Sequence, residues 1–269
     1  MYNLSDLEVA RIVEYGEAQG FIDMFAAAPL EFGCRVERLG SAIAVILPAL
    51  PITLFNRVLC LGLEEPATES HLNMINHLYT QAGVPTHAVQ LASIVEPPHL
   101  TGWLAQHGYQ QDAPWVKMIR LPEPPVVIPT TLRVERITPD HALDFAQVAA
   151  HSFGMPPVII PWLTTLVGRP GWQHSVAYDD TLPVAAGALY IHDEIGWLGI
   201  GGTLPSHRKR GAQGAIMASR IQAAAEAGCK WVVTETGDDL PNHPNPSYHN
   251  MLRTGFELAY KRVNYGYRS

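Results

Sequence analysis

The pattern of apolar and polar positions after residue 130 predicts an alternation of strands and helices. Apolar or alternating runs predict strands at 132–137, 174–178, 183–191, 197–203, 231–236 and 256–265. Apolar residues at helical spacing predict helices at 140–151, 212–227 and 247–253. Gly255 follows the last helix at a position where glycine often ends one. This order of elements indicates an α/β (α+β) fold.

The first half of the chain shows part of the same order. The pattern predicts a strand at 58–63, a helix at 68–81, a strand at 86–91 and a strand-like run at 115–119. One interpretation is a divergent internal duplication, because a repeated order of elements is typical of repeated units. The alternative is that strand–helix–strand units recur in any α/β protein. We favour the duplication.

A proline-rich segment separates the two halves. Prolines at 122, 124, 125 and 129 cannot continue a helix or lie in a central strand. We therefore expect a boundary at this segment. The predicted parts are a first domain at 1–121, a linker at 122–129 and a second domain at 130–269.

The composition is that of a globular protein and excludes some classes of partner. The chain has 269 residues, of which 47% are hydrophobic and 16% are charged, and its formal net charge is -7. This acidity argues against nucleic acid or an anionic membrane as a partner. The three cysteines, Cys34, Cys60 and Cys229, have neither the spacing of a zinc site nor that of a disulfide framework. We therefore expect no metal.

No segment has the sequence pattern of a membrane span or a signal peptide. The most apolar segment, 43–55, is interrupted by Pro48 and Pro51, whereas a spanning helix needs about 20 apolar residues. Residues 1–8 lack a basic region followed by an apolar stretch. We expect a cytoplasmic protein without a membrane partner.

The segment from Thr203 to Gly214 has the strongest chemical signal. It follows a predicted strand and opens a predicted helix, whose first N–H groups lack intrahelical partners and bind anions readily. Gly211 and Gly214 allow an anion to approach the main chain closely. Three basic residues add positive charge: Arg208, Lys209 and Arg210. The alternative is a basic, solvated turn. P-loop spacing is absent, and the glycines within 199–202 do not lead straight into a helix as a dinucleotide-binding fingerprint must.

Pro205, Arg208 and Gly211 have the spacing Pro-x-x-Arg-x-x-Gly at the entry to this helix. In this the chain resembles the GNAT acetyltransferase superfamily, from about residue 132 to the C-terminus. Gln213 departs from the family pattern, which usually has glycine or alanine at that position. The resemblance implies a GNAT fold, with a mixed, mostly antiparallel sheet flanked by helices, in two GNAT-like domains in tandem.

The resemblance also implies a reaction and a set of binding residues. A primary amine of a small molecule or peptide would attack acetyl-CoA directly, without a metal. The residues implied to bind acetyl-CoA are Gly201, Gly202, Thr203, Arg208, Lys209, Arg210, Gly211, Ala212, Gln213, Gly214 and Asn245. The glycine pair within the strand fits a splayed strand that receives the pantetheine arm, or else a simple edge kink. A homodimer is compatible with the sequence.

The candidate catalytic residues are Tyr248 and Glu235. The family often has a tyrosine as general acid where this chain has Met251, and Tyr248 lies three residues earlier on the same helical face. The alternative for Tyr248 is an ordinary half-buried tyrosine. Glu235 lies in a predicted buried strand, so it either reaches a cleft and serves as general base or has a partner that offsets its burial.

Because Met251 replaces the usual tyrosine, the alternative to an N-acetyltransferase is a non-catalytic CoA-binding sensor or interaction module. A longer acyl chain as the transferred group is a third interpretation.

In the first half, Glu64 and Glu65 stand where the phosphate loop would be and would repel a pyrophosphate. We therefore expect the first domain to be degenerate and to hold no nucleotide.

Overall fold

The computed structural model describes residues 3–94, 99–126 and 128–268. The chain forms two compact units, of which the first comprises Met1–Lys117 and Leu258–Ser269 and the second comprises Met118–Glu257. These units differ from the predicted domains, because the last twelve residues belong to the first unit rather than to the second. Val127, in the predicted linker, lies outside the described residues.

The first unit contains a mixed sheet. Its elements are α1 (Asp6–Ala26), β1 (Arg35–Leu39), β2 (Ala42–Ile46), β3 (Arg57–Leu59), α2 (Glu69–Gln81), β4 (Thr86–Leu91), α3 (Leu100–Gln106), most of β5 (Gln110–Arg120) and nearly all of β11 (Glu257–Arg268). The strand order is β1-β2-β3-β4-β11-β5. Strands β3 and β4, which flank α2 in the sequence, pair in parallel, whereas the pairs β1–β2, β2–β3 and β4–β11 are antiparallel. The last strand of the chain therefore pairs inside the first unit.

A buried ion cluster ties four elements of the first unit together. The Glu17 carboxylate of α1 contacts Arg57 of β3 at 2.9 Å, Lys117 of β5 at 2.8 Å, and Arg262 of β11. Burial alone would raise the pKa of Glu17, but the charges of its three cationic partners lower it well below its ordinary value. Removal of one partner of a buried pair leaves a charge without compensation, which is strongly destabilising. The cluster therefore fixes α1 and β11 to the same sheet.

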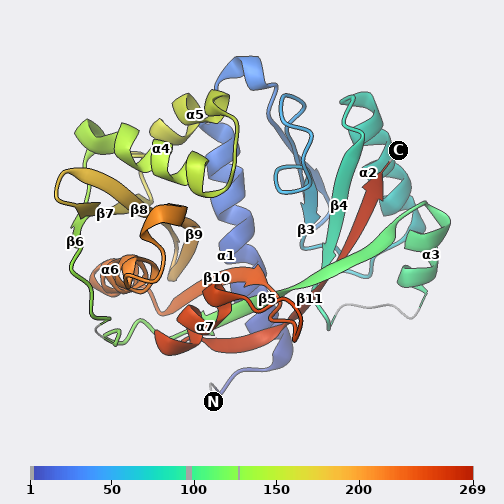
Figure 1. Cartoon of the computed structure of the whole chain (residues 1–269). Coiled ribbons are helices and arrows are strands. Elements are labelled where there is room, and N and C mark those ends of the chain that lie inside the picture. Colours follow the sequence, from blue (N-terminus) through green and yellow to red (C-terminus); the bar gives the residue numbers. More distant parts are fainter. Residues whose placement is uncertain (1–2, 95–98, 127, 269) are drawn as a thin grey trace. The chain divides into compact units, whose positions relative to one another are not determined.

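The second unit contains a sheet that is antiparallel except at one pair. Its elements are β6 (Arg133–Arg136), α4 (Ala142–Ser152), α5 (Ile160–Thr164), β7 (Trp172–Asp179), β8 (Leu182–His192), β9 (Ile195–Thr203), α6 (Ala212–Glu226), β10 (Trp231–Gly237) and α7 (Pro246–Arg253). The strand order is β10-β9-β8-β7-β6, with only β9 and β10 parallel among these described strands. Helices α4 and α6 cover opposite faces of the sheet (Figure 1).

Strand β9 has two irregularities near its end. The parallel register joins Ile195–Trp197 to Trp231–Val233 and extends no further along the described strands. On the other side, Gly187 of β8 faces two residues of β9, Ile200 and Gly201, which is the arrangement of a β-bulge. Ile200 has φ +51°, a backbone conformation that a β-branched residue rarely adopts. The last residues of β9 therefore have no backbone ladder with β10 and have a locally altered direction.

Most of the predicted elements of the second half agree with the structure to within a few residues, but part of the first half differs. The long helix α1 and strands β1 and β2 were not predicted. Helix α1 buries Glu14 and Glu17 along with its apolar residues, which removes the regular apolar stripe. The strand predicted at 58–63 ends at Leu59, because Cys60 has φ +60° and begins a turn. No helix in the described ranges is both long and apolar enough to cross a bilayer.

His87 of β4 is a buried titratable group in the core of the first unit. Its Nε2 lies 2.7 Å from the Tyr109 hydroxyl, and its ring stacks on Tyr79 with 4.0 Å between the ring centroids. Its Nδ1 is buried and has no hydrogen-bond partner among the described residues. Burial lowers the pKa of His87 to about 3.

This burial predicts a pH dependence of stability. Below about pH 6.5 the unfolded chain gains a proton on His87 that the folded chain does not gain until about pH 3. The free energy of unfolding should therefore fall by about 1.4 kcal/mol per pH unit as the pH decreases through this window. Urea unfolding at several pH values should show a smaller slope for His87→Gln than for the unsubstituted chain. The matched variant His77→Gln, at an exposed position of α2, should keep the slope. An equal slope in His87→Gln would contradict the prediction.

Candidate functional site

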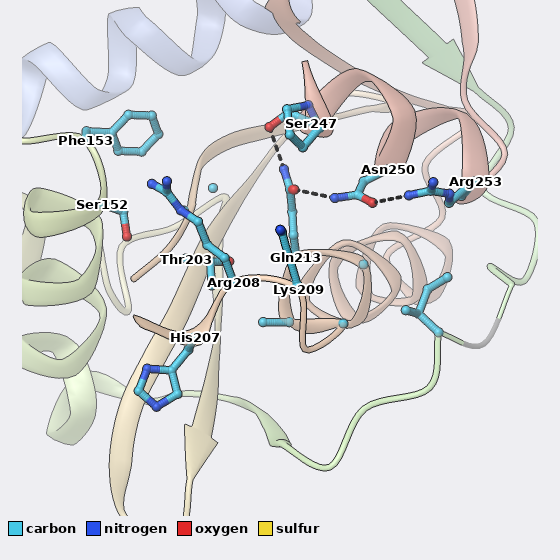
Figure 2. Close-up of a pocket in the computed structure, with 17 residues that line it drawn as sticks. Ser152, Phe153, Thr203, His207, Arg208, Lys209, Gln213, Ser247, Asn250 and Arg253 are labelled. Carbon is cyan, nitrogen blue, oxygen red and sulfur yellow. Dashed lines mark hydrogen bonds between the residues drawn. The ribbon is translucent and has the colours of Figure 1, made fainter. Parts of the chain in front are cut away.

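A cleft of about 740 Å³ opens in the second unit around the end of β9 and the start of α6 (Figure 2). Side chains and backbone from α4, β9, α6 and α7 form its walls. The lining residues are Ile128, Ser152, Phe153, Gly201, Gly202, Thr203, His207, Arg208, Lys209, Gly211, Ala212, Gln213, Gly214, Pro246, Ser247, Asn250 and Arg253. Nine of the eleven residues predicted to bind acetyl-CoA are among them, and the exceptions are Arg210 and Asn245.

Helix α6 begins in the cleft without a side-chain cap. Its N-cap residue is Gly211, and no side chain in the described chain accepts a hydrogen bond from its first turn. A helix of 15 residues thus directs its first N–H groups and the positive end of its dipole at the cleft. This is the geometry of an anion-binding helix N-terminus.

The glycines at this helix start also have a packing role. Gly211 has φ +79°, and a Cβ at this position would lie 2.4 Å from the Pro129 carbonyl oxygen. At Gly214 a Cβ would lie 2.8 Å from a side-chain carbon of Ile128. The segment that precedes β6 therefore packs directly on the first turn of α6. The sequence interpretation, that both glycines leave room for a phosphate, had not included this contact.

The three basic residues of the loop separate into two groups. Arg208 and Lys209 are exposed and line the cleft. Arg210 points elsewhere and makes a bidentate contact with Asp179, with N–O distances of 2.6 and 3.0 Å. Hydrogen bonds from Arg210 lower the pKa of Asp179. The structure therefore brings two of the three predicted cations into the cleft and engages the third in an ion pair.

A chain of polar side chains joins α6 to α7 along one wall of the cleft (Figure 2). Gln213 Nε2 donates to Ser247 Oγ at 2.8 Å, and Gln213 Oε1 accepts from Asn250 Nδ2 at 2.6 Å. Arg253 in turn donates to Asn250 Oδ1 at 3.1 Å. Gln213, the residue that departs from the family pattern, is thus the link between the two helices.

The predicted catalytic residues lie outside the lining of this cleft. Tyr248 is half-buried on α7, with its ring edge-to-face against His249 at 5.7 Å between centroids. Glu235 is half-buried rather than buried, and its two carboxylate oxygens each accept from Trp197 Nε1 at 3.1 Å, so the carboxylate has a partner. Met251 is buried. The roles proposed for Tyr248 and Glu235 stay predictions.

Asn245 caps α7. Its Oδ1 accepts from the Ser247 backbone N–H at 3.0 Å, and its Nδ2 donates to the Gly237 carbonyl at 2.6 Å. These contacts use the amide for the helix start. A contact of Asn245 with a cofactor stays a prediction.

Sequence reasoning predicted Thr203 as a binding residue but missed other lining residues, among them Asn250 and Arg253. The Ser152 and Thr203 hydroxyl oxygens are buried at the cleft and have no hydrogen-bond partner in the described chain. Asn250 and Arg253 follow Ser247 at intervals of three, which places all three on one face of α7. That spacing was a signal in the sequence, whereas nothing local indicated the unpartnered hydroxyl groups. No group of three or more His, Cys, Asp or Glu residues within the described ranges could hold a metal ion.

Solved structures resemble the chain over most of its length. A GCN5-related N-acetyltransferase from Kribbella flavida has a TM-score of 0.65 and 19% sequence identity, covering 97% of this chain and 96% of the other. A tandem GNAT protein from the clavulanic acid biosynthesis pathway has a TM-score of 0.61 and 14% identity, covering 97% and 94%. The chain has the GNAT fold.

A third similar GNAT structure, a GCN5-related N-acetyltransferase from Sphaerobacter thermophilus, has a TM-score of 0.61 and 15% identity, covering 86% of this chain and 82% of the other. No family model matches the chain, and no curated protein has a matching sequence. At these identities the likeness to GNAT structures is one of fold.

Helix α2 of the first unit follows β3, which pairs in parallel with β4, just as α6 follows β9, which pairs in parallel with β10. Unlike α6, helix α2 has a side-chain cap at its N-terminus. Thr68 caps α2 and forms a capping box with His71, at distances of 3.4 and 3.0 Å. Glu64 pairs with Arg11 at 2.5 Å and accepts from the Tyr15 hydroxyl at 2.9 Å. One N–H group in the first turn of α2, that of His71, and the preceding acidic residue Glu64 therefore already have protein partners. That the first GNAT-like unit holds no nucleotide stays a prediction.

The polar chain predicts that Gln213 stabilises α7. Gln213→Ala removes two neutral hydrogen bonds, each contributing about 0.5–1.5 kcal/mol, so amides of α7 should exchange with solvent roughly 5- to 150-fold faster. The matched variant Gln222→Ala, exposed on the same helix and bonded to Glu226, should leave α7 exchange unchanged. Equal exchange in Gln213→Ala would show that the contact does not hold α7.

Proposed function

We propose that the chain is a GNAT-type acyltransferase that transfers an acetyl group from acetyl-CoA to a primary amine of a small molecule or peptide. One observation carries the proposal. The bulged end of β9, the uncapped start of α6 and three cationic side chains line the same cleft.

The chemistry of the cleft fits acetyl-CoA. The lining side chains with a permanent charge, Arg208, Lys209 and Arg253, are all cationic, although the whole chain has a net charge of -7. Together with the first N–H groups of α6 they would hold the phosphates. Strand β9, whose ladder with β10 ends at Trp197, offers backbone groups to the pantetheine arm. The volume of about 740 Å³ lies within the usual range of ligand sites.

In the proposed reaction the amine nitrogen forms a bond to the thioester carbonyl carbon, the carbon–sulfur bond breaks, and the thiolate takes up a proton. The backbone N–H groups near Gly202 and Thr203 would donate to the oxyanion that develops on the carbonyl oxygen. The unpartnered hydroxyls of Ser152 and Thr203 are buried beside the cleft, and rotation of either side chain would bring its hydroxyl to the acceptor. Tyr248 would supply the proton and Glu235 would accept one from the amine, each through water, because neither lines the cleft.

A CoA-binding sensor is the second candidate function. The observation that favours it is that neither Tyr248 nor Glu235 lines the cleft and that a buried Met251 occupies the position of the usual tyrosine. A sensor would bind acetyl-CoA at the same residues and release no thiol. Turnover therefore separates the two candidates.

The different positions of Arg208 and Arg210 predict a difference in binding. In calorimetry with acetyl-CoA, Arg208→Ala should weaken binding roughly 10- to 100-fold, because it removes a charge-assisted contact with phosphate. Arg210→Ala should have little effect, because Arg210 is engaged by Asp179. Pantetheine, which lacks the nucleotide phosphates, should bind both variants equally. Equal losses for acetyl-CoA in the two variants would contradict the assignment of phosphate to the Arg208 side.

A panel of amines incubated with acetyl-CoA and read by thiol release tests the reaction itself. With an amine that supports turnover, Tyr248→Phe should lower kcat by roughly 10²- to 10⁴-fold and leave acetyl-CoA affinity nearly unchanged, as expected for loss of a general acid. Unchanged kcat would remove Tyr248 from the mechanism. Binding without thiol release from any amine would favour the sensor.

A further inference from the structure

Arg220, in the middle of α6, is a buried cation inside the second unit. It is 4% exposed, and its guanidinium donates to three backbone carbonyls, those of Ala188 at 3.0 Å, Gly199 at 3.1 Å and Ile216 at 3.4 Å. No carboxylate in the described chain pairs with it. Burial lowers the pKa of Arg220 to about 9. A buried charge without a counter-ion is costly, so its presence requires an explanation.

The guanidinium lies in the space that the bulge of β9 leaves open. Two of its carbonyl partners, Ala188 and Gly199, form the last residue pair before the bulge. A Cβ at Gly187, opposite the bulge, would lie 2.7 Å from Arg220 Cζ, and one at Gly201 would lie 3.2 Å from the nearer terminal nitrogen of the same group. Arg220 therefore occupies the place that two side chains would otherwise fill.

The other face of the same backbone is the cleft. Gly201, Gly202 and Thr203 follow the bulge and line the cleft. A Cβ at Gly202 would meet Ser152 of α4 on the side opposite Arg220. Arg220 thus holds the Gly199 carbonyl, directly before the bulge and the strand segment whose backbone N–H groups would bind the thioester carbonyl.

The groups packed around Arg220 do not offset its charge. His174 of β7 is buried, with no partner for its Nε2 among the described residues. The pKa of His174 is lowered to about 3, mainly by burial and to a smaller extent by the charge of Arg220, so this ring is neutral. No carboxylate of the described residues balances Arg220, whereas a negative charge would arise on the thioester oxygen during the proposed reaction.

We propose that Arg220 is a positioning residue for acyl transfer, which fixes the bulge of β9 so that its backbone N–H groups meet the developing oxyanion and which places a buried positive charge behind them. This inference rests on the proposed function. Arg220 has no contact with the cleft itself and acts through the backbone of β9.

The test uses the full chain and acetyl-CoA labelled with a heavy isotope at its thioester carbonyl. Binding should shift the infrared band of that carbonyl to lower frequency, because donors polarise it. The Arg220→Met variant should bind acetyl-CoA nearly as well as the unsubstituted chain but should lose most of this infrared shift. Its kcat should fall by roughly 100-fold, the effect expected when a reacting group is misplaced. Arg220→Lys, which keeps the charge but not the planar fork, should recover part of both.

The control is Ile221→Ala, on the same helix and fully buried. It should lower stability and leave the infrared shift unchanged, which separates positioning from a general loss of packing. An unchanged shift in a folded Arg220→Met protein would overturn the inference alone. Absence of acetyl-CoA binding by the unsubstituted chain would overturn the proposed function and the inference with it. If neither Arg220 variant folds, Arg220 serves the fold alone and the inference is wrong.

Discussion

The end of the parallel ladder between β9 and β10 at Trp197 is the constraint on which the second unit depends. Beyond this point β9 has a ladder with β8 only, and the bulge at Ile200 interrupts even that one. Backbone N–H and C=O groups of β9 that would pair with β10 in a continuous sheet are therefore available to a ligand. The loop that follows leads directly to Gly211 and the first turn of α6, so the bulged strand and the helix start open into one cleft.

The two units share a strand–helix–strand arrangement but differ in how the first turn of the helix is capped. In both, a helix follows a strand that pairs in parallel with the strand after the helix. In the first unit Thr68 caps that helix and Glu64 has an arginine partner. In the second unit the helix starts at an uncapped glycine, and the neighbouring cations Arg208 and Lys209 are exposed. The difference lies in a few side chains at one helix end, where a cap satisfies donors that an anion could otherwise bind.

The sequence predicted features that depend on local periodicity and on short motifs. The strands and helices of the second half and the loop from Thr203 to Gly214 are of this kind. Features that depend on partners distant in sequence were not predictable, such as the pairing of Arg210 with Asp179. Helix α1 was not predicted because its buried residues include Glu14 and Glu17. Arginines from other elements offset the charge of these two carboxylates, and no local sequence pattern indicates such ion pairs.

The position of β11 determines when, during synthesis of the chain, the first unit can complete its fold. Glu17 is synthesised near the start of the chain, and its partner Arg262 follows 245 residues later. Strand β4 likewise lacks its antiparallel neighbour until the ribosome has produced the last strand. Domains usually fold in the order of their synthesis, but here the unit that begins first can complete its sheet only after all of the second unit has emerged. Until that moment the edge of β4 is open to pairing with other strands, so the nascent chain is at risk of misassembly for as long as translation of the second unit lasts.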